Sequence, residues 1–439
     1  MNELEGSNSM NNDQGGGISI IIPSHNRCIS LRRTLDGIGE QEGYEGSMEI
    51  IVVADGCTDD TVVMLNHYKC SFPLTVLEQP GKGAAAARNH GAAKASGRLL
   101  FFIDDDIVPT QAWLHAHINA HRRHPGSVVM GPYYPVRQGR AGYAALEVRL
   151  WWYRKFGTLE RDGHRFTYRD LLSGNLSIDA SLFKAVGGFD EAIRNAGGED
   201  YELGARLIRH GTSFRFIPDA MAYHYEHETM DLSRMLKRAR QEGVADVHIG
   251  RNHPTLRPTL ELARYADISS WRGKAVCWSI FNQTAAVDTI ARALFRLLPV
   301  YEALGLRSAW RRLFIRLRRY WYLRGVVDEL NTHDTLIKFM QGGPPHTDCG
   351  GVEMEVDLND GLPNIEALLD RELPQGLRIR YKELAIARIP PEAGAEPLRS
   401  SHLRPLLAKS EFTWLLGRAL ITDSLMRPQQ VFEQNGPLD

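Results

Sequence analysis

The feature that most constrains this chain is a repeated alternation of apolar runs and helix-forming segments between residues 18 and 106. The apolar runs are ISIII, MEIIVVA, PLTVLEQ and RLLFFID, and a segment of helical character follows each of the first three. Strands that alternate with helices in this way pair into a parallel sheet with helices on both faces. The sequence therefore predicts an α/β fold with a mostly parallel central sheet flanked by helices.

Changes in composition predict four parts along the 439 residues. Residues 1–17 are rich in Asn, Gly and Ser and are expected to form a disordered tail. The α/β domain is expected at 18–230, a helical extension at 231–334 and a small appended module of unknown role at 335–439. Within the α/β domain, further short strands are expected at SVVMGPYYP, RFTYRDLL and SFRFIP.

The charge balance excludes one broad class of partner. The chain has 52 Lys and Arg against 53 Asp and Glu, which gives a net charge of −1. A protein that binds nucleic acid is expected to be strongly basic, so no nucleic-acid partner is predicted. Five scattered cysteines without a C-x-x-C pair favour a reducing compartment.

Targeting signals are also missing from the sequence. No apolar run approaches the about 20 residues of a spanning helix, and the start lacks the basic and apolar regions of a secretory signal. We therefore expect a cytoplasmic protein.

Polar side chains follow each predicted strand of the sheet. Pro23, Asp55, the turn 79–82 and the triplet 104–106 all fall at carboxyl ends. Ligands of open α/β sheets bind beyond these ends. This coincidence predicts a binding site along one edge of the sheet.

The acidic triplet Asp104-Asp105-Asp106 directly follows the apolar run LLFFI. Three adjacent carboxylates repel one another, and burial at a strand end increases that repulsion. A divalent cation removes it, and hard oxygen ligands suit Mg²⁺ or Mn²⁺. Alternate residues of an extended segment point the same way, so Asp104 and Asp106 can face one site. The alternative is an acidic turn that caps the next helix.

A second acidic element, Glu199-Asp200, follows two glycines and begins the predicted helix EDYELGARLIRHG. Carboxylates in a first helical turn interact favourably with the helix dipole, so simple capping is one interpretation. The functional interpretation is a carboxylate that acts as a general base.

Two loops at the predicted strand ends offer contacts to a nucleotide. Asp55, in the turn DGCTDD, can accept hydrogen bonds from a base or ribose, or it can simply cap the next helix. The run GKGAAA at 81–86 resembles a dinucleotide-binding turn, but two strand–turn units precede it and two polar-turn residues separate it from its strand. We therefore expect this loop to present Lys82 and Arg88 to a diphosphate.

Three further features have both a structural and a functional interpretation. His224, or its neighbour His227, can complete a metal site begun by Asp106, although a lone histidine is more often structural. Residues 151–153 (WWY) can stack on a sugar ring or belong to the core. The segment 303–327 has seven arginines, no lysine and no acid, with apolar residues at helical spacing. It predicts either peripheral contact with the inner face of a membrane or a core helix with a solvated basic face.

Five segments in order are similar to the family-2 glycosyltransferases of the GT-A fold. They are ISIIIPSHNR, EIIVVADGCTDDT, GKGAAAARNHGAAKASGRLLFFIDDD, SGNLSIDASLFKAVGGFDE and GGEDYELGARLIRHG, and they span about residues 18–230. The resemblance implies an inverting transfer of a sugar from a nucleotide-sugar donor, most often UDP-linked, to an acceptor hydroxyl. The acceptor can be a saccharide, a lipid-linked molecule or a small molecule.

The resemblance also implies roles for single residues. Asp55 is expected to contact the base, Asp104 the ribose and Asp106 the metal, with His224 as a second metal ligand in some members. Asp200, with Glu199 beside it, is expected to act as the catalytic base. The residues expected at the donor are Pro23, Asp55, Lys82, Arg88, Asp104 and Asp105.

The chain departs from the family pattern at one point, and two alternative functions are considered beside the resemblance. No Q-x-x-R-W element follows the helix at 199–211, where the chain instead has RMLKRARQEGV, and this favours single transfers over polymerisation. The alternative function is a non-catalytic nucleotide-sugar-binding module with the same fold. A nucleotidyltransferase is disfavoured, because IIPSHNR lacks a Gly-rich basic phosphate loop.

Overall fold

A computed structural model describes the chain in the ranges 16–41, 44, 46–136, 142–194, 197–225, 231–266, 271–282, 284–342 and 353–426. The chain forms two compact units, which are described separately. Unit 1 comprises Met1–Glu160 and Phe166–His346, and unit 2 comprises Arg161–Arg165 and Thr347–Asp439. Most of the tail expected at 1–17 lies outside the described residues.

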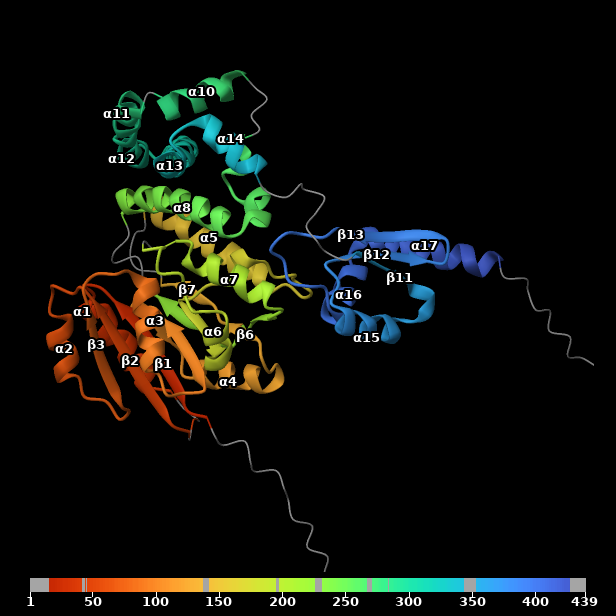
Figure 1. The fold of residues 1–439 in the computed structure, drawn as a ribbon, viewed down its shortest axis with the longest axis horizontal. Coiled ribbons are helices and arrows are strands. Elements are labelled where there is room, and N and C mark those ends of the chain that lie inside the picture. The colour runs from red at the N-terminus through yellow and green to blue at the C-terminus, as the bar shows by residue number, and fades with distance from the viewer. Residues whose placement is uncertain are drawn as a thin grey trace, which may run out of the picture. The chain divides into compact units, whose positions relative to one another are not determined.

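The core of unit 1 is a seven-stranded sheet with the order β3-β2-β1-β4-β8-β6-β9 (Figure 1). Its strands are β1 (Ile18–Ser24), β2 (Met48–Asp55), β3 (Leu74–Gln79), β4 (Leu99–Ile103), β6 (Val128–Met130), β8 (Asn175–Asp179) and β9 (Phe214–Phe216). The four strands expected to be parallel are parallel, which confirms the α/β prediction. β8 pairs antiparallel with both β4 and β6.

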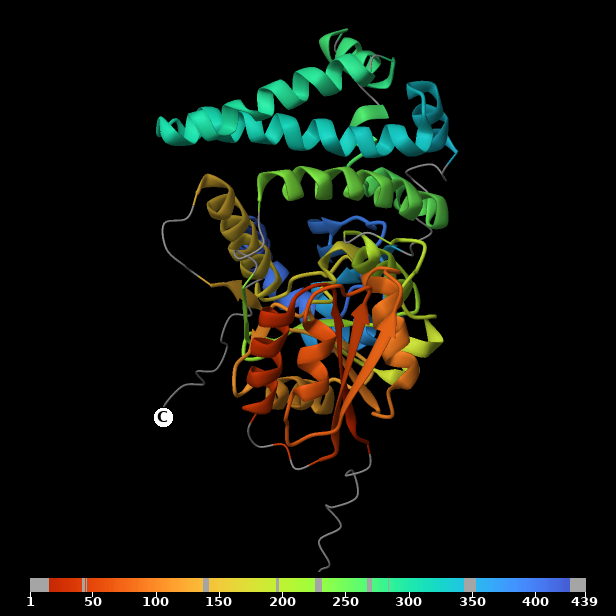
Figure 2. The same cartoon turned by 90° about the vertical axis from the view of Figure 1, so that its left-hand side faces the viewer.

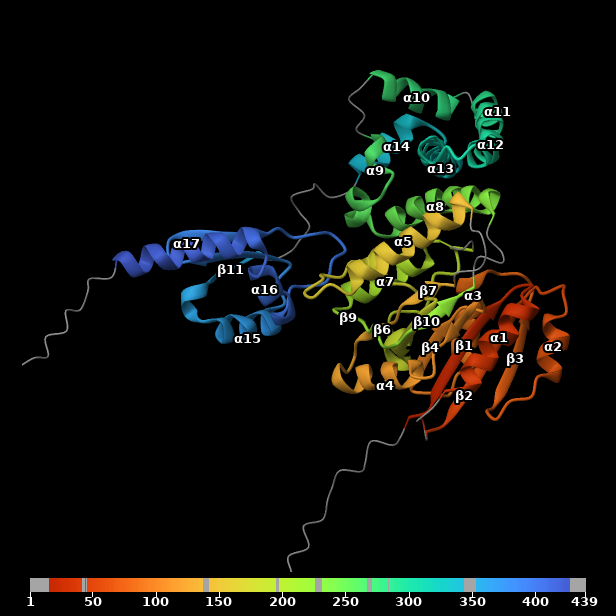
Figure 3. The ribbon, with the colours of Figure 1, turned by 180° about the vertical axis from the view of Figure 1, so that it is seen from behind.

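Helices on both faces bury the central strands. β1 and β4 are buried along their whole length, as continuous apolar strands of a covered parallel sheet must be. Helices α1 (Cys28–Gly39) and α2 (Thr61–His67) lie over one face, and α3 (Ala84–Lys94) lies over the other (Figures 1 and 3). The alanines of α3 allow close packing, so Ala87 reaches the β2 side chains.

A second, three-stranded sheet has the order β5-β10-β7. Its strands are β5 (Ile107–Pro109), β7 (Tyr133–Pro135) and β10 (Ala222–His224). The segment SVVMGPYYP thus divides into β6 and β7, which belong to different sheets. SFRFIP contains the expected strand as β9.

The prediction of a strand in RFTYRDLL is wrong. Tyr168–Asp170 forms the 3₁₀ turn η1, because the Asp170 carboxylate accepts hydrogen bonds from the Thr167 N–H and hydroxyl at 2.8 and 3.2 Å. Lys155 also lies 2.6 Å from Asp170 Oδ1. These local bonds favour a turn over a strand.

The helices of unit 1 that follow the first α/β repeats include a long helical extension, as expected. They are α4 (Trp113–Arg123), α5 (Tyr143–Leu159), α6 (Ala180–Ala185), α7 (Glu199–Arg209), α8 (Leu232–Asn252), η3 (Pro254–Thr259), α9 (Ala263–Ala266), α10 (Trp271–Asn282), α11 (Thr284–Phe295), α12 (Leu297–Ala303), α13 (Arg307–Leu330) and α14 (His333–Gln341). α8 and α13 lie side by side (Figure 2). Gly243 and Gly325 stand at their crossing, where an added Cβ would meet a backbone oxygen at 2.1 and 1.9 Å.

Unit 2 is a small α/β module. The parallel pair β11 (Glu353–Asp357) and β12 (Gly376–Tyr381) is extended by the antiparallel strand β13 (Leu384–Ile389). Its other elements are η4 (Leu358–Asp360), α15 (Leu362–Glu372), α16 (Ser400–Leu407) and α17 (Ser410–Met426). An apolar core that includes Ile365, Ile379 and Leu403 holds them together. None of the helices in the described ranges of either unit combines the length and apolar character that a bilayer crossing requires.

Candidate active site

The carboxyl ends of β1 and β4 bring two loops into contact. The Ser24 hydroxyl, at the end of β1, donates a 2.6 Å hydrogen bond to Asp105 Oδ2. Arg27, three residues further, donates to Asp106 Oδ2 and lies 3.8 Å from Asp105 Oδ1. The predicted acidic triplet is therefore held from the β1 side by a hydroxyl and a guanidinium.

Arg88 of α3 joins the triplet to the start of α7. Its guanidinium donates to Asp104 Oδ1 at 2.8 Å and to Glu199 Oε1 at 3.3 Å. Arg88 is 4% exposed, so these charges interact away from bulk water. The two acidic elements that the sequence singled out, which are 95 residues apart, thus lie at one site.

Two glycines shape the start of α7. Gly198 has φ of 124°, and an added Cβ there would lie 2.5 Å from the Ala245 side chain of α8. The N–H of Gly197 donates a 2.8 Å hydrogen bond to Glu199 Oε2. The Glu199 carboxylate is thereby fixed between this N–H and Arg88, and neither of these two hydrogen bonds involves Asp200.

Asp200 is a half-buried carboxylate with an unusual environment. Its Oδ1 is shielded from solvent and has no hydrogen-bond partner in the described part of the chain. Burial, followed by the neighbouring negative charge of Glu199, raises the pKa of Asp200 to about 7 despite Arg88 and a Ser173 hydrogen bond. A carboxylate with such a pKa can exchange a proton near neutral pH, as a general base must.

The carboxylates of Asp105 and Asp106 have opposite pKa shifts. Burial and the charge of Asp106 raise the pKa of Asp105. Burial also opposes ionisation of Asp106, but His224 and Arg27 outweigh it and lower the pKa of that carboxyl. Asp106 is therefore the carboxylate of this pair that stays ionised. Its negative charge disfavours ionisation of Asp105.

His224 lies beside Asp106 because β10 pairs with β5, which places His224 opposite Ile107. Its Nε2 is 3.4 Å from Asp106 Oδ1. The rings of Tyr133 and Trp152 pack against the His224 imidazole with centroids 5.6 and 5.9 Å away. The rival ligand His227 lies outside the described residues.

The loop after β3 is held by Asp55. Asp55 Oδ1 accepts from Gln79 Nε2 at 2.8 Å and from the Lys82 N–H at 2.6 Å, and its Oδ2 accepts from the Gly83 N–H at 2.7 Å. The carboxylate is 7% exposed and occupied by these donors. In this structure Asp55 therefore orders the loop that carries Lys82, and its contact with a base stays a prediction.

The remaining predicted residues differ in how far they are buried. Pro23 is buried in β1 opposite Val53, so its contribution is to the strand end rather than an exposed surface. The Lys82 side chain is exposed on the loop. Of the aromatic segment, Trp152 is buried in the wall behind His224, while Trp151 and Tyr153 are 47% and 55% exposed.

Sequence reasoning missed three contributors to the site: Ser24 at the end of β1, Arg27 in the loop that follows, and the segment before β8. Gly174 accepts from the Asp104 N–H at 3.3 Å, and an added Cβ would lie 3.0 Å from Asp104 Oδ2. Ser24 and Arg27 follow a predicted strand end, so the reasoning that found Asp55 also applies to them. The approach of Gly174 follows from the antiparallel insertion of β8 beside β4, which the local pattern does not indicate.

The donor set for a divalent ion is partial. Across the described ranges, no three histidine, cysteine or carboxylate side chains converge into a ready-made metal cluster. Asp106 and His224 offer two adjacent donor atoms, and Arg27 occupies the second oxygen of Asp106. These two residues suit an ion whose other ligands come from a bound phosphate or water, as Mg²⁺ sites commonly do.

Comparisons with known families agree with the order of these elements. The model described as Glycosyl transferase family 2 matches residues 19–187. The model described as N-terminal domain of galactosyltransferase matches residues 156–228. Together the matches span the strands, the triplet and the start of α7.

Curated relatives are similar over about half of this chain. Validoxylamine A glucosyltransferase of Streptomyces hygroscopicus subsp. jinggangensis is 28% identical over 55% of this chain and 62% of its own length. Chondroitin synthase of Pasteurella multocida is 28% identical over 48% of this chain and 25% of its own length. The chain thus spans less than two thirds of these relatives.

Among solved structures, the mannosyltransferase PcManGT from Pyrobaculum calidifontis, in complex with GDP-Man and Mn²⁺, is 17% identical. The alignment covers 71% of this chain and 87% of that one, with a TM-score of 0.47. TarS 1–349 of S. aureus is 16% identical, over 75% and 93% of the two chains, with a TM-score of 0.41. With the α/β sheet and the ordered motifs, the match over residues 19–187 places this segment of the chain in glycosyl transferase family 2.

Proposed function

We propose that the protein is an inverting glycosyltransferase that moves a sugar from a nucleotide-sugar donor to an acceptor hydroxyl. The observation that carries the proposal is the Arg88 bridge, which holds Asp104 and Glu199 at one site beside the shielded oxygen of Asp200. A site of this kind has a cation-binding side, a diphosphate side and a base within one group of residues.

In the proposed reaction, the acceptor oxygen attacks the anomeric carbon and forms the new glycosidic bond. The bond from that carbon to the diphosphate oxygen breaks, and the nucleoside diphosphate leaves with the electron pair. Asp200 takes the acceptor proton, which leaves a neutral carboxyl. A single displacement from the face opposite the leaving group inverts the anomeric centre.

Asp200 suits the base role because its raised pKa gives it a useful proton affinity near neutral pH. Its Oδ1 has no hydrogen-bond partner among the described residues, so its capacity to accept a proton or a hydrogen bond is unused. A positioned base contributes about 10²–10⁴-fold to such a step. Glu199 acts beside it by raising the pKa of Asp200, second in effect to burial.

A divalent ion, Mn²⁺ or Mg²⁺, is proposed as the cofactor. Asp106 and His224 would hold it, since their donor atoms are 3.4 Å apart. When bound, such an ion supplies Lewis-acid stabilisation of negative charge on a diphosphate. Arg27, which donates to Asp106 Oδ2, supplies positive charge beside the same carboxylates.

The donor side is proposed to comprise Asp104, Asp105, Arg88, Lys82 and Asp55. Arg88 and Lys82 supply positive charge for the diphosphate. A uridine nucleotide is the first donor to test, because the resemblance described above implies it. The acceptor is proposed to be a saccharide, a lipid-linked molecule or a small molecule.

The direct experiment is release of nucleoside diphosphate from a panel of nucleotide sugars, with Mn²⁺, with Mg²⁺ and with EDTA. The account predicts release from at least one donor, dependent on the metal and stimulated by a matching acceptor. Thermal stabilisation by a donor without turnover, across all acceptors, would instead support the non-catalytic binding module.

Peripheral contact with an anionic membrane is a separate proposal, motivated by the arginines of α13. Seven arginines without an acid occupy residues 303–327. Flotation with vesicles that contain phosphatidylglycerol tests it at low salt. Absence of flotation would contradict it without any bearing on sugar transfer.

A further inference from the structure

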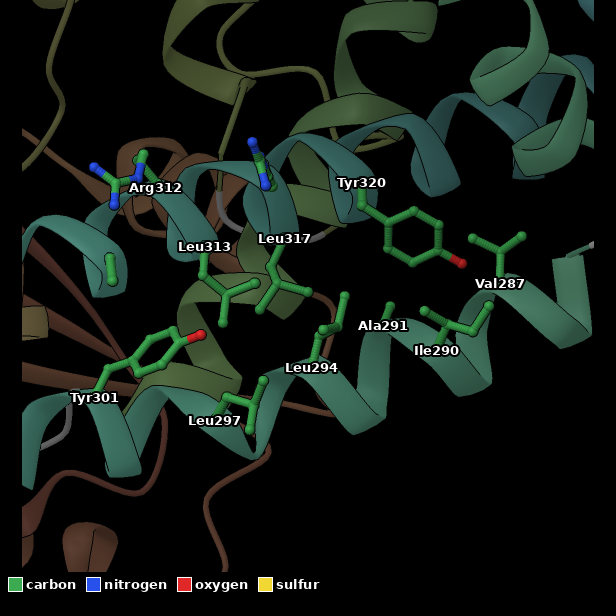
Figure 4. Close-up of a pocket in the computed structure, with 12 residues that line it drawn as sticks. Val287, Ile290, Ala291, Leu294, Leu297, Tyr301, Arg312, Leu313, Leu317 and Tyr320 are labelled. Atoms are coloured by element: carbon green, nitrogen blue, oxygen red, sulfur yellow. The ribbon is translucent and has the colours of Figure 1, made fainter. Parts of the chain in front are cut away.

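A groove in the helical extension lies between α11–α12 and α13 (Figure 4), and none of the acids described above lines it. Its volume is about 380 Å³. The α11–α12 side presents Ile290, Leu294 and Leu297, and the α13 side presents Leu313 and Leu317. The groove is therefore apolar on both sides and is formed by the two arms of a helical hairpin.

The apolar side chains are only partly covered by the protein itself. Ile290, Leu294 and Leu297 are 58%, 38% and 37% exposed. Next to them, at the turn between α12 and α13, Leu304 and Leu306 are 65% and 46% exposed. Contiguous exposed apolar surface marks a site of contact with a partner or a lipid.

Two arginines line the groove beside these apolar side chains. Arg312 and Arg316 lie one turn apart on α13, and neither has an acidic partner within the described part of the chain. Three other arginines of the same helix have acidic partners: Arg311 lies 3.1 Å from Glu147, Arg318 lies 2.8 Å from Glu242 and Arg324 lies 3.1 Å from Asp288. Unpaired positive charge is thus retained at the groove, and no acid lines it.

The chemistry of the groove favours a lipid over a peptide helix. Apart from two tyrosines, Arg312 and Arg316, its lining is aliphatic. A hydrocarbon chain is narrower and needs no hydrogen bonds. Adjacent arginines suit the phosphate of a headgroup, since guanidinium–phosphate hydrogen bonds are charge-assisted.

We infer that this groove holds a hydrocarbon chain of an anionic membrane lipid, with Arg312 and Arg316 on its phosphate. The inference deepens the proposed membrane contact and rests on it, but it is independent of the catalytic proposal. It identifies α11 and α12, outside the arginine-rich segment, as half of the contact surface. It also distinguishes two of the α13 arginines from the others.

The test uses the full chain and two matched double variants. Arg312→Gln/Arg316→Gln removes the groove arginines, and Arg307→Gln/Arg319→Gln removes the same charge from exposed arginines of α13 that do not line the groove. In flotation with phosphatidylglycerol vesicles, the first variant is expected to lose at least 10-fold in partitioning and the second less than 3-fold. Equal losses of partitioning in the two variants would overturn the assignment of the lipid to the groove and would indicate a general effect of basic surface charge. Absence of flotation by the wild type would instead reject the membrane contact itself.

A second measurement tests the apolar part with a soluble probe. Calorimetry with short-chain phosphatidylglycerol, below its critical micelle concentration, is expected to give saturable binding at least 10-fold tighter than that of short-chain phosphatidylcholine. Glycerol phosphate, which has the anion without chains, is expected not to bind. Leu294→Gln should weaken the binding at least 10-fold, while Leu304→Gln, outside the lining, should not. Equal binding of glycerol phosphate, or no effect of Leu294→Gln in a protein of unchanged Tm, would overturn the inference.

Discussion

Arg88 Nη2 donates a 2.8 Å hydrogen bond to Asp104 Oδ1, and the same guanidinium reaches Glu199. This contact joins α3, the turn after β4 and the start of α7 through one buried cation. Without Arg88, the carboxylates of two segments, the turn after β4 and the start of α7, would face one another with less compensation. The contact therefore carries both a structural and a functional prediction.

Arg88→Gln is predicted to destabilise unit 1 markedly. Removing one member of a buried ion pair leaves an uncompensated charge, and the expected loss in the free energy of unfolding is about 3 kcal/mol. Urea denaturation measures it. Arg98→Gln serves as the control, because its 3.4 Å pair with Asp179 involves an arginine side chain that is 61% exposed and should contribute at most about 1 kcal/mol. Equal losses in the two variants would contradict a special role for Arg88.

The pH dependence of turnover is predicted to follow Asp200. The base is active when ionised, and burial and Glu199 raise its pKa to about 7, so kcat/KM should rise with pH through that region. Glu199→Gln removes a neighbouring negative charge, lowers the pKa of Asp200 and should move the acidic limb to lower pH. Rate profiles at constant metal concentration measure the shift. An acidic limb that does not move would separate Glu199 from the ionisation of Asp200.

Buried histidines predict loss of stability in acid. Burial lowers the pKa of His117 to about 3, and the ring contacts Ser177 and Asn175. Between about pH 3 and its ordinary pKa of about 6.5, the unfolded state binds a proton that the folded state does not. Stability should therefore fall as pH decreases through this window, by at most about 1.4 kcal/mol per pH unit for one histidine.

His117→Gln tests this expectation because glutamine retains polar atoms and does not titrate. Its free energy of unfolding should depend less on pH between 3 and 6.5 than that of the wild type. His121, whose pKa burial lowers to about 4, contributes to the slope that remains in the variant. Identical slopes in the wild type and the variant would show that His117 is not kept neutral by the fold.

The crossing of α8 and α13 predicts a steric effect of a single methyl group. An added Cβ at Gly325 would lie 1.9 Å from the Arg240 carbonyl oxygen, so Gly325→Ala must move the two helices apart. The expected cost is about 1–3 kcal/mol. Gly157→Ala in α5 is the matched control, because nothing lies within 4 Å of its added Cβ. It should be neutral or stabilising by about 0.5–1 kcal/mol. Thermal unfolding that ranks the two variants the other way would contradict the close crossing.

The sequence predicted most of what parallel pairing determines. The strands that end at Ser24, Asp55, Gln79 and Ile103 were recognisable from buried apolar runs, and parallel pairing places their ends on one edge. The Glu199-Asp200 helix start was visible as a glycine pair before two acids. Its position beside Asp104 depends on Arg88, and no spacing rule in the sequence indicates that contact.

Non-local pairing accounts for what sequence reasoning did not find. β8 enters the sheet antiparallel beside β4, and this brings Gly174 against Asp104. Asp55 accepts loop N–H groups from residues 27 and 28 positions away, which its local turn pattern does not reveal. The turn at 168–170 follows from the Thr167–Asp170 capping box, which outweighs the strand-like composition around it.

The most direct measurement of the central proposal compares donor binding and turnover in Asp200→Asn and Asp106→Asn. Both variants should lose transfer, Asp200→Asn by about 10²–10⁴-fold, because each removes a carboxylate that the reaction needs. Donor affinity in the presence of Mn²⁺, measured by calorimetry, should survive in Asp200→Asn and fall sharply in Asp106→Asn. Two results would contradict the account: turnover by Asp200→Asn at the wild-type rate, or a donor affinity in Asp106→Asn equal to that of the wild type.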